Sequence, residues 1–182
     1  KVVGLASAGT DTQNAIKQAA EFGLTQAGQN LAGLLLMISD VHGLGLQAAQ
    51  GLYLTETFYW DRDDQSRDFG NRYKERTGAM PTMVQAGTYS AVLSYLKAIE
   101  AANSDDAAAV SKQLKSMTIN DAFARNATVA PNGRLMNDVF LMQVKTPEES
   151  KGEWDYYNVR ATIPGAEAYM KPAEAGCPLV TG

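Results

Sequence analysis

The fold is decided by residues 2–38, whose sequence is VVGLASAGTDTQNAIKQAAEFGLTQAGQNLAGLLLMI. Residues 2–6 are small and apolar, and they predict a buried strand. Residues 10–13 form a capping-box pattern, whose hydroxyl and amide groups satisfy free N–H groups at the start of a helix. Ile16, Ala19 and Ala20 then make the inner face of that helix. Gly23 is its expected stop, because glycine adopts the left-handed conformation without a Cβ clash.

A second strand is predicted at residues 34–38, which form a continuous apolar run. A continuous run, as opposed to an alternating one, is typical of a strand that is buried on both faces of a parallel sheet. Strand, helix and strand together form a βαβ unit, so the expected fold class is α/β. Residues 39–43 are expected to form a polar loop at the carboxyl end of this strand, where open α/β sheets bind their ligands.

The remaining elements follow from similar patterns. A short helix is expected over residues 44–50 and a third strand over 52–59, followed by a charged connector at 61–67 and a helix that ends at Gly78. Residues 83–102 form the clearest helix, and a further helix follows Ser104. The apolar stripe of the long helix consists of Tyr89, Val92, Leu93, Leu96 and Ile99. The turn signal at 131–133 predicts a hairpin between residues 128–130 and 134–144, and a last strand is expected at 156–163.

Composition excludes several classes of protein. The 182 residues carry 16 Lys+Arg and 20 Asp+Glu, a formal charge of -4, which gives no large positive field for binding nucleic acid. The longest apolar run, residues 31–38, is far shorter than the roughly 20 residues of a membrane-spanning helix. Because Lys1 leads straight into a strand, without an initiator Met or a signal peptide, we expect the chain to begin at a cut.

Cysteine and histidine are too few for the common metal sites. Cys177 is the only cysteine, so the chain can form neither an internal disulfide nor a cysteine-rich zinc site. It is either a free thiol or one half of a bridge to a segment that is not present here. His42 is the only histidine, and the carboxylates show no clustered spacing, so no metal and no cofactor are expected.

Two catalytic patterns were considered and both fit poorly. Residues 43–48 match the G-x-G-x-x-A dinucleotide fingerprint, but the next strand follows too soon for the crossover of about a dozen residues that this motif requires. Ser39, Asp40 and His42 are the residue types of a hydrolase triad. Neighbours in one short segment cannot line up nucleophile, base and orienting carboxylate. We therefore expect no enzymatic activity, and His42 can be an ordinary hydrogen-bonding residue.

Binding is the better use of these side chains. A carboxylate at a strand end, such as that of Asp40, can neutralise an amino group of a ligand, although Asp40 could equally cap the short helix that follows. Aromatic residues near the same region can line a pocket. Because side chains alternate along a strand, Tyr59 and Trp60 are the favoured candidates. Asp40 suits an amino acid, whereas the aromatic residues would also suit an aromatic acid.

The order of these segments resembles that of type I periplasmic binding proteins of the branched-chain amino acid family. The resemblance is carried by residues 2–6, 14–24, 51–53, 73–78, Pro81 and 87–92, and it is strongest in KQAAEFGL (residues 17–24) and in the long helix. It implies a periplasmic, solute-binding component of an ABC importer, which has a membrane permease as its partner and catalyses nothing. Amide sensors and receptor ligand domains share these segments, so a ligand-sensing domain is the alternative function.

The resemblance also implies two α/β lobes, each built on a parallel sheet and joined by crossing strands, with the ligand held between them. Family members are about twice this length, and the chain is similar only to their later half. Residues 1–58 are therefore expected to form part of the C-terminal lobe, residues 59–118 helices of the N-terminal lobe, and residues 119–182 a return to the C-terminal lobe with a tail. An early segment, which supplies further ligand contacts in the family, would be a partner of this chain.

Six positions match the family's ligand-facing segments. By this resemblance, Ser7 and Ala8 occupy a ligand-facing loop at a strand end, and Asp40 falls where an acidic residue commonly meets a ligand ammonium group. Tyr59 is expected near the hinge. Gln85 and Tyr89 are expected near the start of a helix that faces the cleft.

Overall fold

The computed structural model describes residues 1–176 and residue 180, and it has a mixed α/β fold with a parallel core. Cys177, whose pairing the sequence left open, lies outside the described residues. The strands are β1 (Val2–Leu5), β2 (Asn30–Gly33), β3 (Tyr53–Glu56), β4 (Thr118–Ile119), β5 (Ala127–Val129), β6 (Leu135–Met136), β7 (Val139–Val144) and β8 (Tyr157–Ile163). The helices are α1 (Gly9–Glu21), α2 (Ile38–Leu44), α3 (Leu46–Ala49), α4 (Asp64–Thr77), α5 (Met83–Ala102), α6 (Ala107–Ser116) and α7 (Gly165–Ala168), and a 3₁₀ turn spans Pro172–Glu174.

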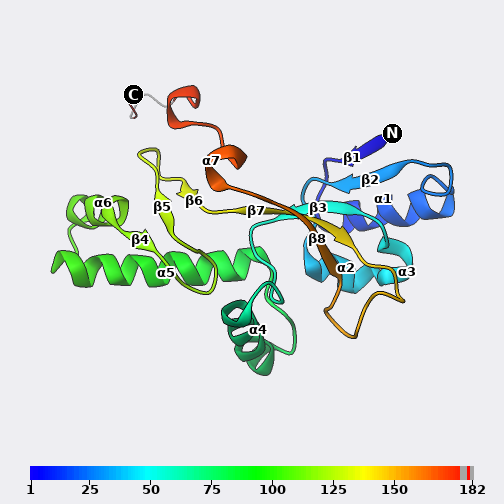
Figure 1. Cartoon of the computed structure of the whole chain (residues 1–182), viewed down its shortest axis with the longest axis horizontal. Coiled ribbons are helices and arrows are strands. Elements are labelled where there is room, and N and C mark those ends of the chain that lie inside the picture. Colours follow the sequence, from blue (N-terminus) through cyan, green and yellow to red (C-terminus); the bar gives the residue numbers. More distant parts are fainter. Residues whose placement is uncertain (177–179, 181–182) are drawn as a thin grey trace.

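The larger sheet has the strand order β1-β2-β3-β7-β8. Strands β1, β2 and β3 are parallel, whereas β7 and β8 run antiparallel to their neighbours. Because β1, β2 and β3 point the same way, their carboxyl ends meet at one edge of the sheet. Figure 1 shows β7 and β8 extending from this sheet toward the other half of the molecule, where α5 and α6 lie.

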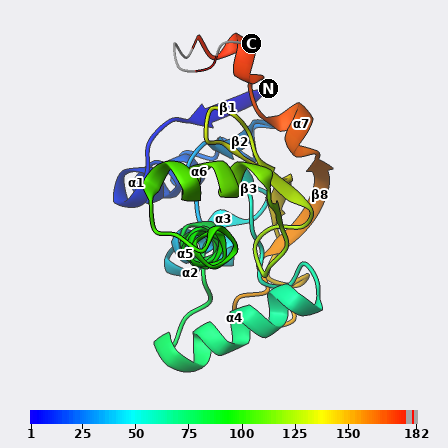
Figure 2. The same ribbon diagram turned by 90° about the vertical axis from the view of Figure 1, so that its left-hand side faces the viewer.

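The smaller sheet, β4-β5-β6, is antiparallel and lies beside α5 and α6. Each half has its own hydrophobic core. The first core packs the larger sheet against α1, α2 and α3, and it includes Ile16, Ile38 and Leu54. The second core contains Phe58, whose ring lies 5.8 Å from Phe69 and 6.5 Å from Phe123. Viewed from the α5 end, α4 lies below both halves (Figure 2).

The long helix α5 spans Met83–Ala102, as predicted, and α4 ends at Gly78, as predicted. Gly78 has a φ of 80°, which glycine adopts without strain. The buried side of α5 differs from the predicted one. Its apolar stripe is largely exposed, and small residues are buried in place of that stripe. The exposed members include Tyr89 (40%), Val92 (54%) and Leu96 (56%), and the buried residues are Ala86, Ser90, Ser94 and Ala98.

The prediction of a strand at residues 34–38 was wrong. The strand lies four residues earlier, at Asn30–Gly33, and Leu34 is 64% exposed. The chain bends after Gly33, where a Cβ would approach the side chain of Leu36 to 2.8 Å. The expected polar loop at 39–43 is instead part of α2, because the Asp40 carboxylate accepts the N–H of Met37 and so caps a helix that begins at residue 38.

The hairpin was predicted correctly only near its turn. Strands β5 and β6 pair as expected, with Thr128 opposite Met136, and Gly133 of the turn has a φ of 82°. The second arm is not one strand over 134–144, because β7 joins the larger sheet from Val139 onward. No helix within residues 1–176 is long and apolar enough to cross a membrane.

Candidate functional site

The candidate site lies at the carboxyl ends of β1, β2 and β3. Ser7 follows β1, and its hydroxyl oxygen lies 2.8 Å from that of Thr12 in α1. Ala8 precedes α1 with an extended backbone. This contact fixes the loop after β1 against the first turns of α1, so its position is set before any ligand binds.

Asp40 is half-buried in the first turn of α2. Its Oδ1 accepts a hydrogen bond from the amide of Gln13 at 2.9 Å, and its Oδ2 accepts the N–H of Met37 at 3.0 Å. Because Gln13 follows Thr12 in α1, this helix brings Ser7 and Asp40 into one region. The capping role considered for Asp40 is therefore present in the structure, and a carboxylate oxygen retains acceptor capacity for a ligand.

Glu56 is a residue of this region that the sequence interpretation missed. It ends β3, is only 1% exposed, and its Oε1 accepts the hydroxyl of Tyr157 at 3.2 Å. A signal was present in the sequence. Leu52, Leu54, Glu56 and Phe58 occupy every second position of the chain, and the three apolar residues are buried. The pattern therefore places the carboxyl group of Glu56 among buried apolar residues.

Burial dominates the electrostatics of Glu56. Because an ionised carboxylate loses its hydration inside the core, burial raises the pKa of Glu56 from 4.5 to about 8. Three donor groups lower the pKa of Glu56, namely the hydroxyl of Tyr157 and the backbone N–H groups of Ile38 and Met83. The nearby charge of Asp40 adds to the rise. At neutral pH the Glu56 carboxyl is therefore mostly protonated.

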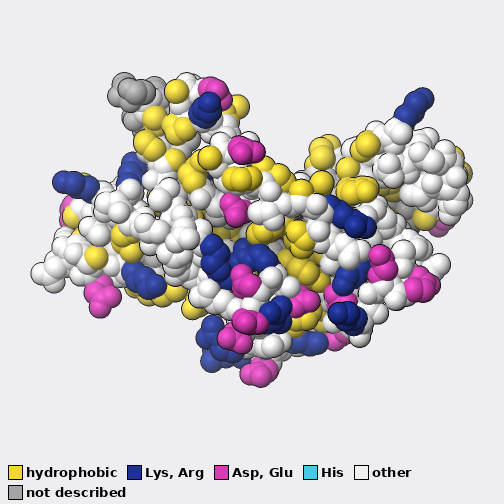
Figure 3. Space-filling model, in the orientation of Figure 1, with side chains coloured by type: hydrophobic (Ala, Val, Ile, Leu, Met, Phe, Trp, Pro, Cys, Tyr) yellow, Lys and Arg dark blue, Asp and Glu magenta, His cyan; other side chains and the backbone are white. Residues whose placement is uncertain are grey.

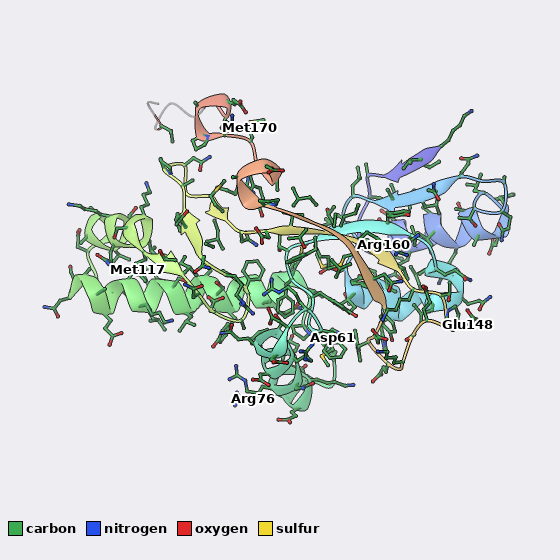
Figure 4. The ribbon with its side chains drawn as sticks, in the orientation of Figure 1. Asp61, Arg76, Met117, Glu148, Arg160 and Met170 are labelled. Carbon is green, nitrogen blue, oxygen red and sulfur yellow. The ribbon has the colours of Figure 1, made fainter. Side chains whose placement is uncertain are left out.

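Tyr59, expected near the hinge, lies on the connector between β3 and α4 and is buried. Its hydroxyl donates to Asp155 at 3.4 Å, and Asp155 also contacts the ammonium group of Lys145. Burial raises the pKa of Tyr59 above its usual range. The connector continues through Asp61, labelled in Figure 4, which accepts a hydrogen bond from Arg67 at 2.9 Å.

Gln85 and Tyr89 both lie in the first two turns of α5, but they have different surroundings. The side-chain oxygen of Gln85 accepts the N–H of Thr82 at 2.9 Å, so Gln85 takes part in the capping box of α5. Tyr89 lies 4.9 Å from the ring of Phe69 and lines a cavity of about 600 Å³ between α4, α5 and residues 120–122. Polar and charged side chains make up most of its lining, among them Arg72.

His42 belongs to an aromatic cluster. Its Nδ1 lies 2.8 Å from the hydroxyl of Tyr156, and its ring stacks on Trp154 with centroids 4.0 Å apart. The carboxylate of Asp40 bonds elsewhere, to α1 and to residue 37. Within residues 1–176, no group of three or more His, Cys, Asp or Glu side chains is placed to hold a metal ion.

The structure thus brings Ser7, Ala8 and Asp40 together through α1, and it places Glu56 at the end of β3, where the charge of Asp40 and the N–H of Met83 both act on its pKa. Gln85 belongs to that turn. Tyr59 lies inside the protein, and Tyr89 faces the cavity beside α4. The chemistry available at the strand ends is hydrogen bonding and charge neutralisation, which suits capture of a small polar molecule.

Comparison with known proteins gives a consistent result. The family described as "Periplasmic binding protein" matches residues 1–153. A periplasmic binding protein from Burkholderia mallei is 48% identical, with a TM-score of 0.92 over 99% of this chain and 48% of its own. A branched-chain amino acid ABC transporter periplasmic ligand-binding protein from Burkholderia xenovorans is 42% identical, with a TM-score of 0.87 over 95% of this chain and 46% of its own.

A solute-binding protein of an ABC transporter from Rhodopseudomonas palustris, solved with 3,4-dihydroxybenzoic acid, shares the fold at 19% identity, with a TM-score of 0.72 over 90% of this chain and 45% of its own. No curated protein matches the sequence. The chain spans about half the length of the solved structures that it matches.

Proposed function

Since this chain belongs to the periplasmic binding protein family, we propose that it is part of the solute-binding component of an ABC importer. In this function a small organic solute, an amino acid or a related amide or aromatic acid, binds in a cleft between two lobes. Closure of the lobes around the solute is a population shift driven by the tighter binding of the closed form. The protein acts in the periplasm, delivers the solute to a membrane permease and performs no catalysis.

The observation that carries this proposal is the meeting of strand-end side chains with the first turn of α5. Glu56 at the end of β3 and Asp40, whose charge acts on it, come from one half of the chain, and the N–H of Met83 at the start of α5, which also acts on Glu56, comes from the other. Ligands of open α/β sheets bind at the carboxyl ends of strands, so this junction is where a solute would contact both halves.

Two exposed apolar surfaces support a larger, two-lobed protein. Val92 and Leu96 lie on the exposed stripe of α5, and contiguous exposed apolar side chains mark surfaces that other segments contact. Figure 3 shows the upper outline of the molecule dipping between the part that carries α7 and the end that carries β1, with hydrophobic side chains along the dip. We propose that further parts of a polypeptide of the relatives' length cover these surfaces. Of the expected lobe boundaries, residues 119–136 would change sides, because they pack with α4 and α5 around the second core, and the return to the lobe of residues 1–58 would begin at β7.

Within this function, Asp40 is the residue proposed to select an amino acid. Its carboxylate would neutralise the ligand ammonium group, and Ser7 and the backbone at Ala8 would bind polar groups beside it. Binding of Leu, Ile or Val is the finer proposal, because the residue type at position 40 suits an α-amino group. Gln85 in the first turn of α5 is proposed to border the cleft, whereas Tyr59 is buried and Tyr89 lines the separate cavity beside α4.

The test is isothermal titration calorimetry of the full-length protein with a panel of amino acids, their amides and aromatic acids. We expect at least one member to bind, and Asp40→Asn to weaken an amino acid at least tenfold while leaving an aromatic acid unaffected. Asp105→Asn is the control, because Asp105 is exposed in the turn between α5 and α6. No binding across the whole panel would contradict the function. An equal loss for both ligand classes in Asp40→Asn would contradict the role of Asp40.

A further inference from the structure

Glu56 is a buried ionisable residue that solute capture alone does not explain. It is the last residue of β3, and the connector that leads into α4 begins directly after it. Its carboxyl group contacts three other elements. It accepts the hydroxyl of Tyr157 in β8 at 3.2 Å, and the backbone N–H groups of Ile38 at the start of α2 and Met83 at the start of α5 lie close enough to lower its pKa.

These contacts join the two hydrophobic cores. Ile38 and Tyr157 belong to the core of the larger sheet, whereas Met83 packs against the second core. The carboxyl of Glu56 therefore lies where a relative movement of the halves changes its surroundings. If α5 moved away from α2, the carboxyl would lose the Met83 N–H and gain water.

The ionisable groups around Glu56 would not keep it charged. Asp40 of α2 is acidic and disfavours a second negative charge, and Tyr157 of β8 offers a neutral hydroxyl. Tyr59 of the connector contributes to the raised pKa of Tyr157. The contact from α5 is a backbone N–H. Desolvation is the largest influence, and it raises the pKa of Glu56 to about 8.

We propose that Glu56 is a positioning residue whose uncharged carboxyl joins the two cores, so that the approach of α5 to α2, and with it solute binding, takes up one proton. This inference rests on the proposed solute-binding function. It assigns to Glu56 no contact with the solute.

The expected pH dependence follows from linkage. In an open arrangement, water reaches the carboxyl and its pKa returns toward 4.5, whereas in the joined arrangement it is about 8. Between these two values closure takes up a proton, so the joined form weakens as pH rises, by at most about tenfold for each pH unit. Below the lower value and above the higher one, closure is independent of pH.

Small-angle X-ray scattering of the ligand-free, full-length protein tests this inference, with the radius of gyration measured from about pH 5 to about pH 9. We expect the wild type to expand as pH rises and to stop changing above about 8. Glu56→Gln, which carries an uncharged amide of the same size, is expected to stay compact at every pH. A wild type with a constant radius, or a variant that expands like the wild type, would overturn the inference.

Tyr157→Phe separates the proton-linked role from a structural one. Because the hydroxyl of Tyr157 favours the charged form of Glu56, its removal is expected to move the end of the transition to higher pH. A purely structural loss would change the radius by the same amount at every pH. That result, or an unmoved transition, would count against the inference.

Solute affinity is the second readout, with L-leucine and 4-hydroxybenzoate as probes at about pH 6 and about pH 8.5. The affinity of any probe that binds is expected to fall between these values in the wild type and to stay level in Glu56→Gln. Equal pH dependence in both proteins would overturn the coupling. If neither probe binds, the proposed function is weakened, and the scattering result still decides the role of Glu56.

Discussion

Replacing Glu56 by glutamine is expected to stabilise the protein at neutral pH. The carboxyl has a pKa of about 8 in the folded chain and 4.5 as its ordinary value. A group with a raised pKa favours folding fully below the ordinary value, and this contribution is lost as pH rises toward the folded value. Since pH 7 lies 2.5 units above 4.5, holding the proton at pH 7 costs about 3 kcal/mol, at roughly 1.4 kcal/mol for each unit.

Glutamine occupies the same volume, keeps an oxygen that can accept the Tyr157 hydroxyl, and never ionises. We therefore expect Glu56→Gln to raise the free energy of unfolding by up to about 3 kcal/mol at pH 7 and to have little effect at about pH 4.5. The assay is urea unfolding followed by tryptophan fluorescence at several pH values, with the midpoint and slope recorded for each protein.

The control is Glu148→Gln, because Glu148 is exposed in the loop between β7 and β8 (Figure 4). This variant should follow the wild type at every pH. The reasoning is refuted if Glu56→Gln and the wild type lose stability in parallel between about pH 5 and about pH 8, since the carboxyl would then titrate as it does in water.

Three further substitutions test the packing that positions the site, each by the shift of its denaturation midpoint. Phe58→Ala should cost about 3–5 kcal/mol, because it empties the centre of the second core. Asp63→Ala should cost about 1–2 kcal/mol near neutral pH, because it removes the N-cap of α4 and a partner of Arg125. Burial alone would raise the pKa of Asp63, but its hydrogen bonds and nearby arginines lower it to about 2, so this cost should disappear as pH falls through that value. Gly165→Ala should cost about 1–3 kcal/mol, because its Cβ would lie 2.8 Å from the carbonyl oxygen of Asn137.

Local sequence signals predicted those elements whose ends are marked by a residue with one clear conformational role. Gly23 and Gly78 both have positive φ, Gly78 directly after the end of α4 and Gly23 two residues after the end of α1, and Thr82 is the N-cap residue that precedes α5. Such residues act through their own backbone or through neighbours three positions away, so the sequence alone contains the information.

The predictions of secondary structure and burial were wrong where tertiary contacts determine the structure. Residues 34–38 are apolar enough for a strand, but β1 pairs with residues 30–33 and leaves Leu34 exposed. The stripe of α5 is apolar as predicted, yet Ser90 faces inward because its hydroxyl donates to the buried carboxylate of Asp121 at 2.7 Å. No helical period reveals a partner that lies 31 residues away.

The candidate site was predictable in outline and not in detail. Ser7 follows β1 as predicted, whereas Asp40 was expected in a loop after a strand at residues 34–38 and lies instead in the first turn of α2. Hydrogen bonds link both residues to α1. Glu56 was not among the predicted site residues, although its position at every second residue with Leu52 and Leu54 indicates burial. Its contact with the N–H of Met83 depends on the path of the chain through α4 and back, which local sequence does not specify.

The most direct test of the account is a crystal structure of the full-length protein grown with the solute panel. We expect electron density for a solute at the carboxyl ends of β1, β2 and β3, within hydrogen-bonding distance of Ser7 or Asp40. Density in the cavity between α4 and α5, or no bound solute at all, would contradict it.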